Sequence, residues 1–243
     1  MTEAFLWGLV AGSSLVLGGL LALTLPIRER TLGLVMAFGA GVLISAVAYE
    51  LVAEAYETSA GSGHLALGLA AGAVAFYAGD AVVDRMGGDK RKSMGRVAGT
   101  GSGLAIVLGI VLDGIPESAV IGLGLLEGAG VSVAVLAAVF LSNLPEAVAA
   151  TTGLRADGWQ PRRILALWVA VAIVCGLASL VGYAAFDSAG PGALAFVLGF
   201  AAGAILTMLA DTMMPEAFEH GGKLVGLVTT LGFGLAFALS MLE

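Results

Sequence analysis

The sequence predicts an all-α membrane protein, a single transmembrane domain over residues 1–243 that crosses the bilayer eight times. The chain is 59% hydrophobic and only 12% charged, whereas a soluble domain carries about twice that share of charge. Its 37 glycines lie among alanines and leucines, a composition that favours helices packed closely in lipid. Apolar windows of the roughly 20 residues needed to cross a bilayer recur along the whole chain.

The apolar windows are separated by short connections. The longest connection is the polar stretch from Gly87 to Arg96, so no room remains for a soluble domain. The first window begins with an acidic residue, Glu3, and lacks a small-residue cleavage site. We therefore expect it to be a membrane helix and not a signal peptide. The predicted helices span residues 3–25, 32–56, 64–86, 98–124, 128–153, 163–186, 193–219 and 222–242.

The basic residues are distributed unevenly between the connections. Lysine and arginine concentrate in cytoplasmic loops, and all 11 of them follow predicted helices one, three, five or seven. The opposite connections contain Glu57, Glu127 and Asp187 and no basic residue. We therefore expect a multi-pass protein of the cell (inner) membrane with both termini outside the cytoplasm. The basic residues are Arg28, Arg30, Arg85, Lys90, Arg91, Lys92, Arg96, Arg155, Arg162, Arg163 and Lys223.

Two short blocks of sequence occur twice. Phe38–Gly41 and Glu54–Glu57 in the second window recur in similar form as Phe200–Gly203 and Glu216–Glu219 in the seventh, both 162 positions later. The predicted topology makes these two windows run in opposite directions. The pattern predicts an inverted repeat, with helices 1–3 and 6–8 as related units around the helix 4/5 pair. Chance recurrence in a chain rich in alanine and glycine is the alternative explanation.

The fourth and fifth windows each contain a proline followed by a glutamate. The pattern DGIPE, from Asp113 to Glu117, is followed 29 positions later by SNLPE, from Ser142 to Glu146. An acid inside an apolar span is costly and therefore indicates function. Each proline also deprives the carbonyl four residues earlier, on Leu112 or Leu141, of its helical partner. If the two helices face each other, these oxygen donors would cage a cation.

The spacing of the acids supports a cation site. Asp113 and Glu117 share one helix face, as do Ser142 and Glu146, because each pair is four residues apart. Two carboxylates on one face repel unless a cation or a proton lies between them. Protonated or amide-paired acids that only join helices are the structural alternative. The predicted metal ligands are Asp113, Glu117, Ser142, Asn143 and Glu146, with Glu50 and Asp211 expected to line the pathway.

Other classes of function are disfavoured by composition. Two histidines are too few for a histidine-rich zinc site, and the single cysteine, Cys175, excludes an internal disulfide or a thiolate cluster. The net charge of -7 disfavours nucleic acid as a partner. Glycine pairs such as those in Gly122–Gly124 have no phosphate-loop context. We expect a protein that is not an enzyme and that has no resident cofactor.

On these motifs the chain resembles the ZIP (Zrt/Irt-like) divalent metal transporters, in their bacterial branch, over almost its whole length. That branch typically shows H-N-x-P-E-G in helix four and a similar motif in helix five. Here the corresponding segments read DGIPES from Asp113 and SNLPEA from Ser142. LADTMMPEA, from Leu209, and AYELVAEA, from Ala48, are similar to the family's helices seven and two.

The resemblance implies a function and an assembly. A family member would transport a divalent transition-metal ion, zinc or alternatively iron(II) or manganese, into the cytoplasm. Family members commonly form homodimers and move one helix bundle against the other. Some relatives hold a second metal ion through an acid on helix six, but residues 163–186 contain no acid.

The departures from the family motif bear on metal specificity. Both motif histidines are replaced, by Asp113 and Ser142, and the helix-four asparagine is Gly114. Because these positions offer only oxygen, we expect manganese or iron(II) to be carried alongside zinc. Two other functions stay open from the residues alone. One is a membrane protein that binds a metal structurally or as a sensor, and the other is a proton-linked carrier of an organic solute.

Overall fold

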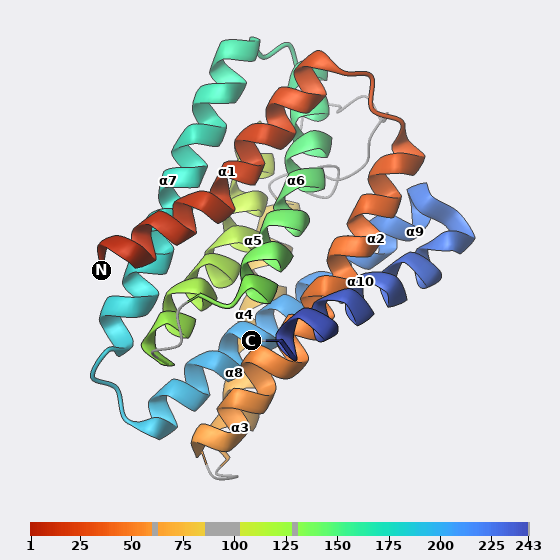
Figure 1. Cartoon of the computed structure of the whole chain (residues 1–243). Coiled ribbons are helices and arrows are strands. Elements are labelled where there is room, and N and C mark those ends of the chain that lie inside the picture. Colours follow the sequence, from red (N-terminus) through yellow and green to blue (C-terminus); the bar gives the residue numbers. More distant parts are fainter. Residues whose placement is uncertain (60–62, 86–102, 128–130, 243) are drawn as a thin grey trace.

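A computed structural model shows the protein as a bundle of long helices (Figure 1). It describes residues 1–59, 63–85, 103–127 and 131–242, and these residues form no strand. The predicted polar stretch Gly87–Arg96 and the first residues of the fourth and fifth predicted helices lie outside the described residues. The all-α prediction is confirmed for the described part of the chain.

The N-terminal part contributes three helical rods, and the middle of the chain contributes two. The second rod is continuous from Glu29 to Ser59 but changes from α- to π-helical geometry within it. Pro116 and Pro145 lie inside the two central rods. The elements are α1 (Thr2–Thr24), α2 (Glu29–Ala46), the π-helix η1 (Val47–Ala53), α3 (Glu54–Ser59), α4 (His64–Arg85), α5 (Gly103–Gly124), the 3-10 turn η3 (Leu125–Glu127) and α6 (Val133–Ala156).

The C-terminal part is arranged like the N-terminal part. Pro161 and Pro191 begin two of its helices, where the missing N–H of proline costs no helical hydrogen bond. Gly222, with a φ of 65°, ends a third helix in a conformation that favours glycine. The elements are α7 (Pro161–Phe186), α8 (Pro191–Met208), the π-helix η4 (Leu209–Met213), α9 (Met214–Gly221), the 3-10 turn η5 (Gly222–Leu224) and α10 (Val225–Ser240).

The helices have the length and composition of membrane spans. Among the described residues, six helical segments are long and apolar enough to cross a membrane. The chain is accordingly a polytopic helical membrane protein. One of the six segments is Pro191–Ser240, of 50 residues, which includes the turn at Gly222, and α5 is not among them. The count of eight crossings therefore stays a prediction.

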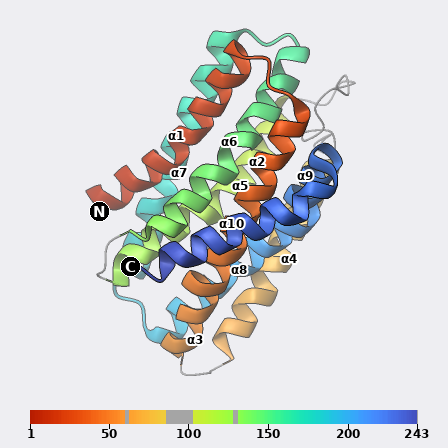
Figure 2. The same ribbon diagram turned by 45° about the vertical axis from the view of Figure 1, so that its right-hand side comes forward.

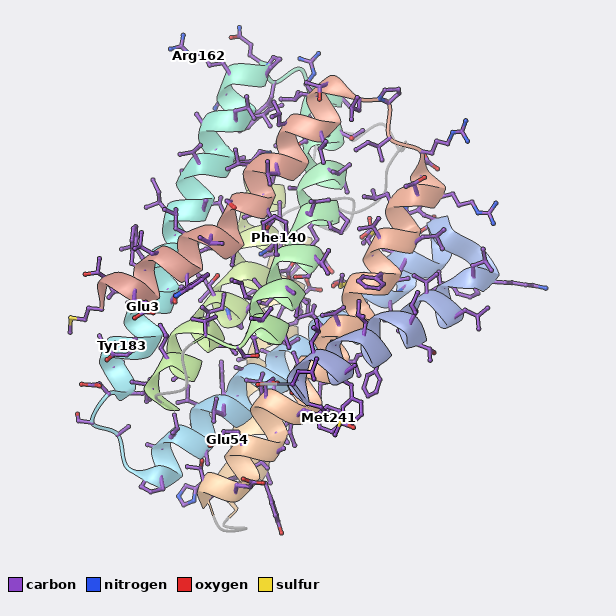
Figure 3. The ribbon with its side chains drawn as sticks, in the orientation of Figure 1. Glu3, Glu54, Phe140, Arg162, Tyr183 and Met241 are labelled. Carbon is purple, nitrogen blue, oxygen red and sulfur yellow. The ribbon has the colours of Figure 1, made fainter. Side chains whose placement is uncertain are left out.

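The described basic residues lie near helix ends. Figure 3 shows one of them, Arg162, at one end of the molecule, and Glu54 toward the other. The described part of the predicted basic set lies at the ends of helices, where charge can reach water. The orientation of these ends relative to the cytoplasm stays a prediction. The described basic residues at helix ends are Arg28, Arg30, Arg85, Arg155, Arg162, Arg163 and Lys223.

The helices form two groups, defined by their principal contacts. The first bundle consists of α1, α5, α6 and α7, in which α1 packs on α6 and α7, and α5 packs on α7. The second bundle consists of α2, α4, α8 and α10 with their continuations α3 and α9, in which α4 packs on α8 and α2 on α10. Figure 2 shows the first bundle at the upper left and the second toward the lower right. The bundles meet mainly where α2 contacts α6 and α5 contacts α8.

Polar and aromatic contacts join helices within the first bundle. The buried indole of Trp168 on α7 donates a hydrogen bond to Thr151 of α6, with an N–O distance of 2.8 Å. Gly19 of α1 makes room for this indole, because a Cβ there would overlap the ring. Ser179 of α7 donates to the Ala4 carbonyl of α1 at 2.8 Å. These contacts connect three of the four helices.

Glycines let α4 and α8 touch backbone to backbone in the second bundle. A Cβ on Gly72 of α4 would overlap the carbonyl oxygen of Phe200 on α8. In return, a Cβ on Gly203 of α8 would overlap the carbonyl of Leu69 on α4. Small residues at such crossings permit the close van der Waals contact that drives helix association in lipid.

Glycines also bring α2 and α10 into close backbone contact. A Cβ on Gly41 would overlap the carbonyl of Thr229, and a Cβ on Gly232 would overlap the carbonyl of Phe38. Gly41 and Phe38 precede Gly203 and Phe200 by the 162 positions noted in the sequence. The bounds of α2 and α8 differ by the same 162 positions at both ends, and η1 and η4 begin 162 positions apart.

Alanine substitutions at two glycines test the importance of these crossings. Gly72→Ala should destabilise the protein by about 1–3 kcal/mol, because the new methyl group overpacks the contact with α8. Gly226→Ala is the matched control, since a Cβ there would meet no atom within 4 Å. It should leave stability unchanged or raise it by up to about 1 kcal/mol through helix propensity. Thermal unfolding in detergent measures both, and equal effects would contradict this view of the packing.

Candidate functional site

Pro116 and Pro145 lie inside α5 and α6, and both helices continue past them through the predicted site. Each proline lacks the N–H that an interior helical residue donates, so one carbonyl in each helix is without its usual partner. The carbonyl oxygen of Leu141 lies 3.1 Å from the position that a Cβ on Gly39 would occupy. This carbonyl therefore faces α2 of the second bundle.

The five predicted ligands on α5 and α6 are all buried. An acid withdrawn from water is costly unless it is paired, protonated or bound to a cation. Three acids, one amide and one hydroxyl buried on two neighbouring helices therefore form an unusual group, which we call the carboxylate group. Their exposed fractions are 1% for Asp113, Glu117 and Asn143, 0% for Ser142 and 8% for Glu146.

A hydrogen bond connects α5 directly with α6. The hydroxyl oxygen of Ser142 lies 3.0 Å from Oε2 of Glu117. The same hydroxyl lies 3.0 Å from the Val139 carbonyl one turn earlier in α6. A hydroxyl has one proton, so it donates to one of these oxygens at a time. The two motifs predicted from the sequence thus meet at Glu117 and Ser142.

The side-chain amide of Asn143 is buried, but its polar atoms make no hydrogen bond with the described residues. Neither Nδ2 nor Oδ1 makes a hydrogen bond within the described part of the chain. A buried donor or acceptor left in this state costs about 1–3 kcal/mol, so such groups are rare in stable proteins. An amide retained at that cost beside Ser142 is suited to contact a ligand through its oxygen.

The two predicted pathway residues lie on other elements than the carboxylate group, namely η1 and η4. Glu50 on η1 is half-buried, and its Oε1 accepts a hydrogen bond from Ser240 at the end of α10. Asp211 on η4 is exposed on the surface of the chain. Both lie in π-helical segments, which often occur at functional positions. Their assignment to a pathway stays a prediction.

A cavity adjoins Glu117 at the boundary between the two bundles. It is partly open, is only large enough for a molecule about the size of water, and is bordered by α2, η1, α5, α6 and α8. Most lining side chains are aliphatic, including Leu43, Val47, Val120 and Val139, and Glu117 is its only charged lining residue. Glu117 thus borders an apolar space between the two bundles.

Sequence reasoning missed a thiol beside the carboxylate group. Cys175 of α7 is buried, and its Sγ lies 3.6 Å from the position of a Cβ on Gly114. The thiol also interacts with Ser118 and, electrostatically, with Glu117. No periodic pattern surrounds a single cysteine in an apolar helix, so only the packing of α7 on α5 reveals this proximity.

The donors of the carboxylate group are mixed in type. Among the described residues, no three His, Cys, Asp or Glu side chains are grouped so that they could hold a metal ion. The group instead combines carboxylates with the hydroxyl of Ser142 and the amide of Asn143. Oxygen donors of these three types are the ligands that hard and borderline divalent cations accept.

Comparison with known proteins adds no family to this description: no family model matches the chain, and no curated protein matches it. The fold and the site define the class as a polytopic helical membrane protein with acids buried where two helices meet. The resemblance noted from the sequence rests on the motif residues themselves, chiefly Pro116-Glu117 and Pro145-Glu146.

Two substitutions distinguish Asn143 from a structural polar residue. Asn143→Leu should stabilise the metal-free protein by about 1–3 kcal/mol, because it removes a buried amide that makes no hydrogen bond. Thr151→Val is the control, since it leaves the Trp168 indole N–H without its acceptor and should cost a similar amount. Thermal unfolding in detergent with a chelator provides the comparison. Destabilisation by both substitutions would show that the Asn143 amide makes hydrogen bonds in the folded, metal-free protein.

Proposed function

We propose that the protein transports a divalent transition-metal ion across the membrane into the cytoplasm, through the carboxylate group between α5 and α6. The observation that carries the proposal is the burial of Glu117 and Glu146, each beside a proline inside a membrane helix. Acids at such depth are expensive and are associated with ion pathways. Zinc is the main expected ion, with iron(II) or manganese as alternatives.

The chemistry of the group favours a cation as the transported species. Ionised Glu117 and Glu146 would bring negative charge into a region of low dielectric, where attraction to a cation is much stronger than in water. The hydroxyl of Ser142 and the amide oxygen of Asn143 can complete a coordination shell without adding charge. A cation that binds there replaces the protons that would otherwise neutralise the acids.

The division into two bundles supports a mechanism of movement. Glycine contacts hold α4 to α8 and α2 to α10 at the level of the backbone, so the second bundle is suited to behave as a rigid unit. Hydrogen bonds from Trp168 and Ser179 connect the first bundle. We propose that the first bundle, which carries the site, moves against the second. The cavity beside Glu117 lies at the boundary between the two bundles.

The element bounds support the inverted repeat. The matching bounds of α2 and α8, the paired π-helices and the equivalent glycine contacts all share one offset of 162 positions. We propose that α1–α4 and α7–α10 are two related units of opposite orientation, giving eight membrane crossings with α5 and α6. Transporters built on this plan bind their substrates at the interface of the repeats.

Two other functions share some of these features. A membrane protein that binds a metal structurally or as a sensor needs the same ligands but no movement. A proton-linked carrier of an organic solute would use the acids as proton relays, and the aliphatic side chains that line the space beside Glu117 are the observation that favours it. The experiment below separates the three.

Uptake of radioactive zinc into proteoliposomes tests the proposal. Glu117→Ala and Glu146→Ala should each reduce uptake to the level of empty liposomes, because each removes a carboxylate from the site. Both variants should retain the elution profile and unfolding temperature of folded protein. Glu219→Ala is the control and should transport normally, since Glu219 is exposed near a helix end.

The outcomes differ between the candidate functions. Wild-type rates in either glutamate variant would refute the assignment of the site. Zinc binding without uptake in the wild-type protein would favour the structural or sensor function. Absence of both binding and uptake, for zinc, iron(II) and manganese alike, would leave the organic-solute carrier.

A further inference from the structure

We propose that the turn between α6 and α7 binds the headgroup of an anionic phospholipid through Arg155, Arg162 and Arg163, with an acyl chain along an exposed apolar face of α7. The proposal requires only that the chain is a helical membrane protein. It therefore goes beyond the proposed transport function and does not depend on it.

One tryptophan in this turn holds two of the three arginines. The guanidinium carbon of Arg163 lies 4.1 Å from the centre of the Trp159 ring, which is the geometry of a cation–π contact. Nη1 of Arg155 donates a hydrogen bond to the Trp159 carbonyl, with an N–O distance of 3.4 Å. Arg155 of α6 and Arg163 of α7 are therefore brought to one place. A guanidinium has five N–H donors, so most donors of Arg155 stay available to a ligand.

The turn that presents these arginines is ordered by its own backbone. The N–H groups of Gly158 and Trp159 donate to the carbonyls of Arg155 and Leu154, both at 3.0 Å. Gly158 has a φ of 82°, a conformation that favours glycine. The Trp159 side chain packs against the buried core of the first bundle. Because the turn is already ordered, a ligand that binds there costs little additional conformational freedom.

The positive charge of the turn is not balanced by neighbouring acids. None of the three arginines makes an ion pair with an acid of the described chain, and Asp157 is the only acid between residues 155 and 163. Arg162 and Arg163 also lie in the first turn of α7, where the positive end of the helix dipole opposes their charge. Guanidinium groups bind phosphate oxygens through two parallel hydrogen bonds. A phosphate group is therefore the ligand that fits this charge.

The adjoining face of α7 indicates that the phosphate belongs to a lipid. Val169, Ile173 and Leu177 follow Arg162 on the same side of the helix, at intervals of seven, four and four residues. Their exposed fractions are 48%, 44% and 47%, so an acyl chain can lie along them while its headgroup contacts Arg162. Figure 3 shows Arg162 at one end of the molecule, and tryptophans such as Trp159 are enriched where membrane helices meet the headgroups.

Native mass spectrometry of the purified full-length protein tests the lipid site. The wild type should retain phosphatidylglycerol about tenfold more strongly than phosphatidylcholine, because only the former has a net negative headgroup. The double variant Arg155→Gln with Arg163→Gln should reduce this preference at least about threefold. Arg28→Gln with Arg30→Gln is the matched control, since it removes the same charge from exposed residues at the start of α2 and should keep the preference.

The contrary outcomes identify which part of the proposal is wrong. Equal retention of the two lipids by the wild type would overturn the selection of an anionic headgroup, and that comparison does not depend on any variant folding. A preference that survives in the double variant, or that falls equally in the control, would overturn the assignment to this turn. Displacement of phosphatidylglycerol by an equal concentration of inorganic phosphate would show that the site binds a free anion, and would overturn the lipid. Zinc uptake tests the proposed function separately from all of these measurements.

Discussion

The burial of Glu117 is the constraint on which the rest of the site depends. A carboxyl group with 1% exposure inside an apolar helix must be neutralised by a proton or a cation, or stabilised by hydrogen bonds. Ser142 supplies one such bond from α6, which is how the two proline-containing helices become one site. The neighbouring Asn143 adds an amide that the described protein leaves unsatisfied. Each of these features is costly for a protein that only needs to be stable.

The packing of the helices surrounds these costly buried groups with two closely packed bundles. Glycine contacts fix α4 on α8 and α2 on α10, so little side-chain volume separates the helices of the second bundle. The first bundle also has close glycine contacts, such as that of Gly122 with Ser179, and adds polar contacts such as that between Trp168 and Thr151. A cavity remains beside Glu117, where the two bundles meet. Tight contacts within each bundle and a cavity between them are what a movement of one bundle against the other requires.

Much of the fold could be predicted from the sequence, because apolar windows and prolines are local signals. The all-helical nature of the described chain followed from them. The π-helical turns could not be predicted, since they arise from how a rod packs against its neighbours. The direction of the Leu141 carbonyl toward Gly39 of α2 could not be predicted either, because it depends on how α2 packs on α6. The position of Cys175 against Gly114 could not be predicted, because it depends on the packing of α7 on α5.

The location of a bound ion is the measurement that tests the central claim most directly. Crystals of the full-length protein grown with zinc, measured at the zinc absorption edge, reveal the ion by anomalous scattering. The account predicts a peak between α5 and α6, within about 2.0–2.2 Å of carboxylate oxygens of Glu117 and Glu146. The same peak should be absent from crystals of Glu117→Ala. Zinc bound only at the surface, with no ion between α5 and α6 in protein that transports zinc, would contradict the account.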